Sequence, residues 1–355
     1  MLPISVCIIA KNEEKYLETC LKKLRRYDWE IIVTDTGSTD RTLEIASHYA
    51  DQLLHFPWIN DFSAARNYGI SHALHDWILS VDSDEYLENN EPDEILLKHL
   101  QDCFRNPASI GMVEIISPFS SSMGPSTNRE LIGRFFHKKH YHYEGKVHEQ
   151  PLSLNASAPS YQPSPFSLFH KGYSDPVLLQ KKARRNISLL KHSLLENPSD
   201  PYMYYQLGES YFVIGEMQNA YETLKKGLTF DVNPELQYVK IMVKSYGHTM
   251  LNLKKYDEAL SFEGIYEAFS SYADFVFLMG LIYMNNGLFE ASIEQFLAAT
   301  RLEDYSTEGS NSFLAFYNIG VIWECLGEKQ KALAYYQRCN SYPPALEGLK
   351  RLGDS

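Results

Sequence analysis

A cluster of carboxylates follows a short apolar segment near residue 80 of this 355-residue chain. Residues 77–81 have the character of a buried strand, and Asp82, Ser83, Asp84 and Glu85 come directly after them. Side chains two positions apart in an extended segment point the same way, so we expect Asp82 and Asp84 to face one side. Two carboxylates that close repel each other unless a cation lies between them.

Oxygen ligands with no cysteine nearby suit Mg²⁺ or Mn²⁺, and these ions usually keep coordination positions open for phosphate oxygens. The carboxylate cluster therefore predicts a site for a metal ion and a diphosphate. The alternative is a solvated turn, because Asp and Ser are also common turn residues.

Strands and helices alternate along the first half of the chain. Apolar runs predict strands over 4–10, 30–35 and 110–119 and from 77 onward. Helical spacing of apolar residues predicts helices over 13–27, 42–50 and 63–74. This order is typical of an α/β domain, with a mostly parallel sheet covered by helices on both faces.

Polar residues follow three of the predicted strands. Asn12 and Glu13 come after the first strand, Asp35 ends the second, and the carboxylate cluster ends the strand at 77. Ligands of such sheets bind beyond the carboxyl ends of the strands. We therefore expect the three strand ends to converge on one crevice.

Helical periodicity replaces the alternation from about residue 200 onward, and a weak repeat recurs there over 204–228, 244–262, 277–300 and 316–339. Small residues at matching positions let paired helices approach closely, and the pattern resembles the tetratricopeptide repeat. We predict an α/β domain over 1–175, a bridging helix and linker over 176–200, and an all-α repeat domain over 201–355. An ordinary helical bundle is the alternative.

Composition narrows the class of protein further. The formal net charge of −12 disfavours nucleic acid as a partner, because phosphate binding needs a basic surface. No apolar stretch reaches the roughly 18 residues of a membrane span, and no basic segment precedes the apolar N-terminal run, so we expect neither a span nor a signal peptide. The five cysteines are scattered, which favours free thiols in a reducing cytoplasm.

The motifs of the first half resemble those of family 2 glycosyltransferases of the GT-A (Rossmann-like) fold. In chain order they are SVCIIAKNEEKYLETCLKKL, EIIVTDTGSTDRTLEIA, NDFSAARNYGI, WILSVDSDE, YEGKVHEQ and FHKGY. The sequence looks most like the branch that carries C-terminal tetratricopeptide-type helices. That branch includes the sublancin-type peptide S-glycosyltransferases.

The resemblance implies roles for individual residues. A nucleotide-sugar pocket would be lined by Ala10, Asn12, Glu13, Asp35, Arg66, Asp82 and Ser83. The divalent metal ion, Mg²⁺ or Mn²⁺, would be bound by Asp84, Asp82 and His170. The alternative for His170 is a histidine that only satisfies a strand end.

Inverting sugar transfer needs a base on the face opposite the leaving diphosphate, to take the proton of the acceptor. Glu149 lies where many relatives have an acidic residue for this role, and His148 is the alternative base. A polar pair that merely ends a hairpin is the structural alternative. We expect four further basic groups to form a solvated face or an acceptor rim rather than to act in catalysis: His137, Lys138, Lys139 and His140.

The resemblance as a whole implies a metal-dependent, inverting transferase that moves glucose or N-acetylglucosamine from a UDP-sugar to a Cys, Ser or Thr side chain of a peptide or protein. Repeat surfaces of this kind form concave binding faces. The alternatives are a transferase acting on a cell-surface glycan or lipid-linked precursor, a non-catalytic repeat scaffold, and a nucleotidyltransferase. A homodimer through the aromatic-rich residues 269–284 is a further prediction, although core packing explains these residues more simply.

Overall fold

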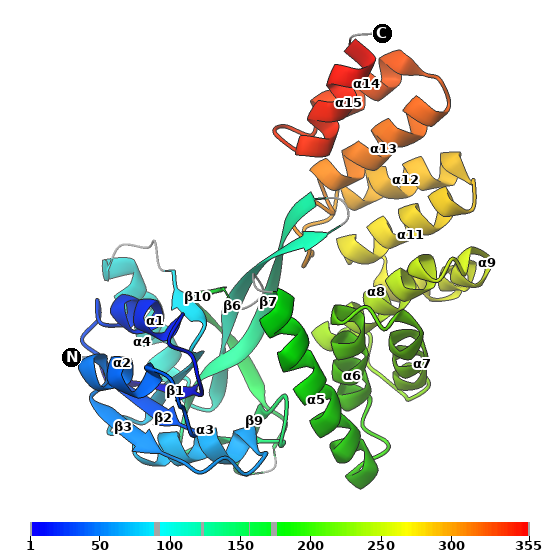
Figure 1. Cartoon of the computed structure of the whole chain (residues 1–355). Helices are drawn as coiled ribbons and strands as arrows, with labels where there is room; N and C mark the ends of the chain where they lie inside the picture. The colour runs from blue at the N-terminus through cyan, green and yellow to red at the C-terminus, as the bar shows by residue number, and fades with distance from the viewer. Residues whose placement is uncertain (1, 89–92, 122–123, 156, 172–175, 354–355) are drawn as a thin grey trace. The chain divides into compact units, whose positions relative to one another are not determined.

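The computed structural model describes residues 2–88, 93–121, 124–155, 157–171 and 176–353. The chain forms two compact units (Figure 1). The first, here called the sheet unit, comprises Met1–Pro118 and Arg129–Pro176. The second, the helical unit, comprises Phe119–Asn128 and Val177–Ser355, so the tip of a long strand hairpin groups with the helices.

One large sheet organises the sheet unit, and it has eight strands within the described residues. Their order is β3 (Gln52–His55), β2 (Glu30–Asp35), β1 (Ile4–Ala10), β4 (Trp77–Asp82), β7 (Gly124–His137), β6 (Ser109–Ser121), β10 (Ser160–His170) and β5 (Glu85–Leu87). The first four are parallel, β7 is antiparallel to β4, and β10 is parallel to β6. The mostly parallel sheet that we predicted is confirmed.

The apolar composition of the central strands fits their buried position in the sheet. β1, β2 and β4 are rich in Ile, Val and Leu side chains that are almost fully buried, as expected of parallel strands covered on both faces. Helix α3 (Phe62–Ser71) packs on β1 and β2, while α1 (Leu17–Leu24) packs on α2 (Thr42–Tyr49) and on β5. These helices therefore lie next to the strand ends that carry the predicted site.

Several elements of the sheet unit were not predicted. Strands β3 and β5 have only four and three residues, which is too short for a periodic signal. The sequence analysis also did not assign α4 (Asp93–Arg105) or the separate two-stranded sheet of β8 (Tyr141–Glu144) and β9 (Gln150–Ser153).

Paired helices make up most of the helical unit, where α5 (Pro176–Glu196) comes first. The pairs are α6 (Pro201–Val213) with α7 (Met217–Gly227), α11 (Ala273–Asn285) with α12 (Phe289–Ala299), and α13 (Phe313–Cys325) with α14 (Lys329–Gln337). In the divergent repeat, α8 (Gln237–Asn252) is followed by α9 (Tyr256–Ala259), the 3₁₀ helix η2 (Leu260–Ile265) and α10 (Tyr266–Phe269). Helix α15 (Pro343–Gly353) packs on α14.

Glycines allow the helices of each regular pair to touch. A Cβ atom at Gly280 would lie 2.6 Å from Cε1 of Phe296 on the partner helix, and one at Gly320 would lie 2.5 Å from Cε1 of Tyr336. Both distances are shorter than real Cβ contacts. Gly280 and Gly320 are therefore required by packing, as the tetratricopeptide-type pattern predicts.

The aromatic-rich segment 269–284 lies in the core of the helical unit. Phe275, Leu278 and Met279 are fully buried, and Phe277 is 5% exposed. Core packing therefore explains the segment, and it cannot be the exposed dimer interface that we considered. Within the described residues, none of the helices combines the length and the apolar character needed to cross a membrane.

Gly280→Ala should destabilise the helical unit by about 1–3 kcal/mol, because the added methyl group overpacks the contact with Phe296. Gly264→Ala is the matched control, since a Cβ atom at Gly264 meets nothing within 4 Å. Urea unfolding followed by circular dichroism measures both. Equal stability of the two variants would contradict the role given to the repeat glycines.

Candidate active site

The carboxyl ends of β1, β2 and β4 meet at one edge of the sheet. In the register of the strands, Ala10 lies opposite Asp35, and Ile9 lies opposite Asp82. The convergence of strand ends that we expected is therefore present. It brings Ala10, Asp35 and Asp82 onto adjoining strands.

Hydrogen bonds tie the loop after β1 to the loop after β2. The backbone amide of Asn12 donates to Oγ of Ser38 at 3.0 Å, and Oδ1 of Asn12 accepts from the amide of Thr39 at 2.8 Å. The amide of Glu13 donates to Oγ1 of Thr42 at 2.8 Å. Asn12 has a positive φ of 55°, which asparagine adopts more readily than most residues. Two residues of the predicted nucleotide pocket thus lie on a loop that the chain itself holds in shape.

The carboxylate of Asp35 closes the turn after β2. It accepts from the amide of Gly37 at 2.9 Å and from that of Ser38 at 3.1 Å, and the side chain is only 1% exposed. A carboxylate oxygen has more than one acceptor site, so these bonds leave capacity for a further donor. A contact between Asp35 and a nucleotide base stays a prediction.

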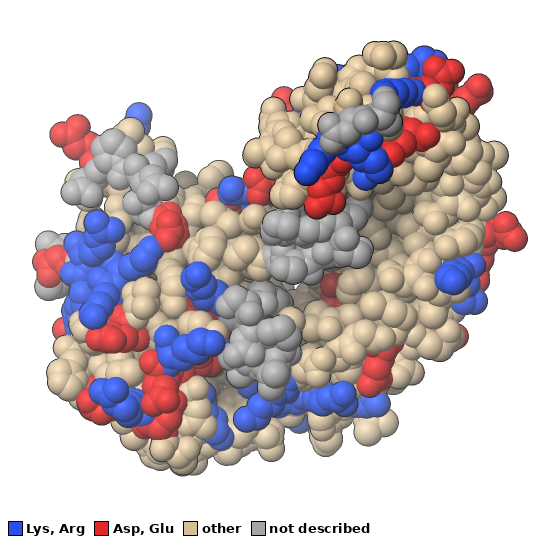
Figure 2. Space-filling view, turned by 45° about the horizontal axis from the view of Figure 1, so that its top comes forward, with Lys and Arg blue, Asp and Glu red and all other residues tan. Residues whose placement is uncertain are grey.

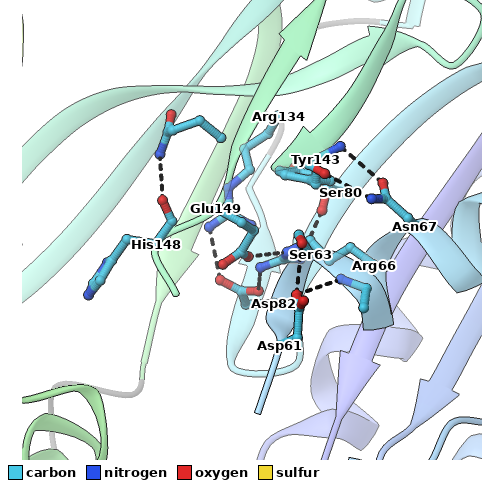
Figure 3. Close-up of polar contacts among 12 residues, drawn as sticks. Asp61, Ser63, Arg66, Asn67, Ser80, Asp82, Arg134, Tyr143, His148 and Glu149 are labelled. Carbon is cyan, nitrogen blue, oxygen red and sulfur yellow. Dashed lines mark hydrogen bonds and ion pairs between the residues drawn. The ribbon is translucent and has the colours of Figure 1, made fainter. Parts of the chain in front are cut away.

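Two arginines hold the carboxylate of Asp82 (Figure 3). Nη2 of Arg66 lies 2.6 Å from Oδ1, and Nη2 of Arg134 lies 2.9 Å from Oδ2. Arg66 also donates from Nη1 to Oγ of Ser80 at 2.9 Å and from Nε to the carboxylate of Glu149. The side chain of Arg66 is 7% exposed, so a buried guanidinium is shared by two carboxylates and a hydroxyl.

The two arginines also determine the charge of Asp82. Burial alone would raise the pKa of Asp82, but the guanidinium groups of Arg134 and Arg66 together hold this pKa well below its usual range. Asp82 is therefore a carboxylate at neutral pH. Neighbouring Glu85 behaves differently, because burial raises its pKa and the attraction of Arg134 does not fully offset that effect.

Helix α3 places Arg66 beneath the strand ends. The carboxylate of Asp61 caps the helix by accepting from a backbone amide of its first turn at 2.9 Å. Gly69 lets the helix approach β2 closely, because a Cβ atom there would lie 2.6 Å from Oγ1 of Thr34. The helix therefore lies close enough to the sheet for Arg66 to reach Ser80 on β4.

The same helix holds the loop that carries the candidate base. The side chain of Asn67 donates to the carbonyl of Tyr143 at 2.8 Å and accepts from the amide of Tyr143 at 3.0 Å. The amide of Phe62 donates to the carbonyl of Lys146 at 2.9 Å. Helix α3 therefore holds this loop at Tyr143 and at Lys146, and the carboxylate of Glu149, three residues further on, lies beside the guanidinium of Arg66.

The two candidate bases have different surroundings. His148 has a φ of 51°, a left-handed conformation that costs a residue with a side chain roughly 1–2 kcal/mol. In Figure 3 the ring of His148 points away from Arg66, whereas the carboxylate of Glu149 points towards it.

Asp84 and His170 lie side by side. Strand β10 pairs antiparallel with β5, so that His170 lies opposite Glu85. Nε2 of His170 is 3.4 Å from Oδ2 of Asp84, and the two side chains are 19% and 5% exposed. Burial alone would lower the pKa of His170, but the carboxylate of Asp84 raises it above its usual value.

The carboxylate of Asp82 has different partners from that of Asp84. Strand β4 ends at Asp82 and the chain turns over residues 83–84, with Ser83 buried, so the strand alternation from which we argued does not apply there.

Among the described residues, no three His, Cys, Asp or Glu side chains are grouped to hold a metal ion. A carboxylate oxygen beside an imidazole nitrogen still suits Mn²⁺, so Asp84 and His170 fit as the protein's part of a site completed by phosphate and water.

The basic groups considered for an acceptor rim lie elsewhere. His137 is opposite Trp77, the first residue of β4, whereas Asp82 is the last. Lys139 pairs with Asp76 at 2.5 Å and is 69% exposed. His137 and Lys139 therefore lie at the opposite edge of the sheet from Asp82, and of the four groups only Lys139 is exposed, while the other three are half-buried.

Two residues of the cluster escaped the sequence analysis, namely Ser80 and Arg134, and Glu85 was recognised only as part of the carboxylate cluster, without a role of its own. Arg134 carried a usable signal, since it is a charged residue directly before the apolar pair Phe135 and Phe136. Ser80 gave none, because a single Ser inside a strand is unremarkable in composition.

Two segments of the chain match the sequence models of known families. Residues 5–150 match the sequence model of glycosyl transferase family 2, and residues 273–304 match a tetratricopeptide repeat. The sheet unit therefore carries a family 2 glycosyltransferase domain, and the helical unit carries a tetratricopeptide repeat. The family resemblance and the two-part fold that we predicted are confirmed.

Curated relatives share parts of the chain. A TPR repeat-containing protein of Synechococcus elongatus is 33% identical over 243 residues, which are 64% of this chain and 57% of that protein. The SPbeta prophage-derived glycosyltransferase SunS of Bacillus subtilis is 30% identical over 236 residues, 64% of this chain and 53% of SunS. The lipopolysaccharide core biosynthesis glycosyltransferase LpsC of Rhizobium meliloti is 33% identical over 92 residues, 24% and 33% of the two chains. The chain spans about half the length of the first two relatives.

The lowered pKa of Asp82 predicts a pH-dependent part of the stability. This contribution is fully present above the unfolded-state pKa of about 3.9 and is lost as the pH falls towards the lower folded-state value. Asp82→Asn should therefore be less stable than the wild type by roughly 1–3 kcal/mol near neutral pH, and the difference should shrink below about pH 4. Urea unfolding without added metal, at a series of pH values, measures this. A gap that stays constant into strong acid would contradict it.

Proposed function

We propose that this protein is an inverting, divalent-metal-dependent glycosyltransferase that moves a sugar from a UDP-sugar to a side chain of a peptide or protein. Family 2 glycosyltransferases generally use nucleotide-sugar donors and often a divalent metal ion. The observation that supports this most directly is the pairing of Asp84 with His170 two residues beyond Asp82, at the carboxyl ends of the strands.

The donor lies across the converging strand ends in this proposal. Ala10, Asn12, Glu13 and Asp35 are on adjoining ends and line the uridine pocket. Mg²⁺ or Mn²⁺ is held by Asp84 and His170, and when bound it stabilises the charge that develops on the departing diphosphate. Asp82 contacts the ribose while the two arginines fix its carboxylate.

The chemistry is a single displacement at the anomeric carbon. The acceptor oxygen or sulfur forms a bond to that carbon as the bond to the diphosphate oxygen breaks, and UDP leaves with the electron pair. The acceptor proton passes to a base on the opposite face. The transition state has oxocarbenium character, and the configuration at the anomeric carbon inverts.

Glu149 is our first choice for the base, and its pairing with Arg66 sets a condition on that role. Oε1 of Glu149 accepts a hydrogen bond from Nε–H of Arg66, so this oxygen has less capacity to take a proton. Oε2 is then the oxygen that takes the acceptor proton. His148 is the alternative base. Its ring points in a different direction from the Glu149 carboxylate (Figure 3).

A peptide or protein acceptor follows from the helical unit. Tetratricopeptide-type arrays form extended concave binding surfaces, and the unit contains one matched repeat within a set of helix pairs. Uncharged side chains cover much of the face of this unit that is visible in Figure 2. Such a surface suits the backbone and small side chains of an extended peptide, with transfer to Cys, Ser or Thr.

A glycan or lipid-linked precursor is the second candidate acceptor. The observation that favours it is the similarity to LpsC, whose name places it in lipopolysaccharide core biosynthesis. That similarity covers 24% of this chain, whereas the similarity to the glycosyltransferase SunS covers 64%. We prefer the peptide acceptor because of the tetratricopeptide repeat in the helical unit.

We place the reaction in the cytoplasm, with glucose or N-acetylglucosamine as the transferred sugar. All five cysteines are free and four of them are buried, as expected of a protein in a reducing compartment. A homodimer through the helical unit remains part of the proposal, through a surface other than the buried segment 269–284.

Mass spectrometry tests the proposal. Wild-type protein with Mn²⁺, UDP-glucose or UDP-N-acetylglucosamine and candidate peptides should produce a mass shift of one hexose or N-acetylhexosamine, and a chelator should stop it. Asp84→Ala should lower the rate at least about 10³-fold. Asp76→Ala is the control, since Asp76 also pairs with a basic side chain but at the opposite edge of the sheet. Near-normal turnover by Asp84→Ala, or transfer to glycans alone, would overturn the metal assignment or the peptide acceptor respectively.

A second pair of variants separates the two candidate bases. Glu149→Gln should lower kcat by about 10²–10⁴-fold, because it cannot take the acceptor proton. His148→Asn should lower kcat less than about tenfold, and Asn tolerates the left-handed backbone at this position. Glu144→Gln controls for the loss of a nearby exposed carboxylate. The reverse order of the two main effects, measured across pH, would assign the base to His148.

A further inference from the structure

Arg134 is a buried arginine that connects two acidic residues of the strand β4 turn. Its Nη2 lies 2.9 Å from Oδ2 of Asp82 and 3.6 Å from Oε1 of Glu85. The side chain is 13% exposed. Arg134 comes from β7, which is antiparallel to β4, so it reaches the turn from a strand far away in sequence.

The contacts of Arg134 form a closed ring. Oε2 of Glu85 accepts from the backbone amide of Asp82 at 2.8 Å, while Arg134 contacts the carboxylates of both residues. The ring thus ties the side chain of Asp82, its backbone and the first residue of β5 to one guanidinium. Asp84 lies inside the segment that the ring closes.

Fold stability alone does not account for this arginine. Nη1 of Arg134 is buried and has no hydrogen-bond partner among the described residues. A buried donor without a partner lowers stability, so the position of this guanidinium calls for an explanation other than stability. Asp82 already has a charge partner in Arg66, and Glu85 already has the amide of Asp82.

We propose that Arg134 is a positioning residue for sugar transfer, which fixes the Asp82–Glu85 turn so that Asp82 meets the donor and Asp84 faces His170. This inference rests on the proposed transferase function. The flat guanidinium contacts two carboxylates at once, and a lysine ammonium cannot reproduce that geometry. Displacement of a reacting group by about 1 Å is enough to cost a hundredfold in rate.

Arg134 therefore acts on the donor rather than on the acceptor. Loss of its guanidinium leaves Asp82 attached to Arg66 alone and leaves the Glu85 carboxylate without its charge partner. The turn then becomes mobile at the position where the donor binds. The acceptor side, which is held by Asn67 and the α3 contacts, keeps its shape.

Steady-state kinetics on the full chain, with Mn²⁺ and the UDP-sugar that the wild type uses, tests this inference. Arg134→Met should lower kcat/KM for the donor at least about 30-fold, with the acceptor KM changed less than about twofold. Arg134→Lys should recover only part of the loss. Arg129→Met is the matched control, since Arg129 lies on the same strand and also pairs with a carboxylate, that of Glu114, at 2.9 Å. The control should stay within about twofold of the wild type.

Thermal unfolding and UDP binding complete the experiment. A purely structural role predicts a lower Tm with unchanged donor kinetics below that temperature, and this result would overturn the inference. If Arg134→Met does not fold, Arg134→Lys and Glu85→Gln decide, and donor kcat/KM values within twofold of the wild type in both would also overturn it. A wild type that neither binds UDP by calorimetry nor transfers sugar would instead overturn the proposed function.

Discussion

A buried guanidinium needs carboxylate or hydroxyl oxygens that accept its hydrogen bonds. This requirement organises the whole candidate site. Arg66 lies under the strand ends and satisfies the requirement with Asp82, Glu149 and Ser80. The three partners come from β4 and from the loop after β8, which no local interaction would bring together. Removing either carboxylate would leave buried charge uncompensated, and removing Ser80 would leave a buried donor without its acceptor, so each change should destabilise the site.

This constraint explains why the loops around the site need so many contacts of their own. Asp61 caps α3, Gly69 lets that helix lie close to β2, and Asn67 pairs with the backbone of Tyr143. Each contact removes freedom from a segment that carries a charged group. The polar groups are therefore held in place by the fold in advance of binding, which lowers the cost of ordering them around a donor.

The two aspartates of the acidic turn have separate surroundings, and that separation is the main departure from the expected pattern. Asp82 is held by guanidinium groups and stays ionised, whereas Asp84 contacts an imidazole on β10. Charge compensation is thus divided between two different kinds of partner. The arrangement lets two carboxylates remain close together in the chain without sharing one cation.

The sequence by itself determined that β1, β2 and β4 are strands of a mostly parallel sheet and that a repeat of helices follows, because these features come from local periodicity and from motifs. Through the family resemblance it also predicted that Asp84 and His170 act together, and the structure places the two side chains 3.4 Å apart. Only the tertiary structure decided that Arg134 meets Asp82, that Glu149 pairs with Arg66 and that His137 lies at the far edge of the sheet. Those facts depend on the antiparallel register of β7 against β4 and on the course of the loop after β8. Such long-range pairings leave no periodic trace in the sequence, because they are set by which strands and loops pack together and not by neighbours along the chain.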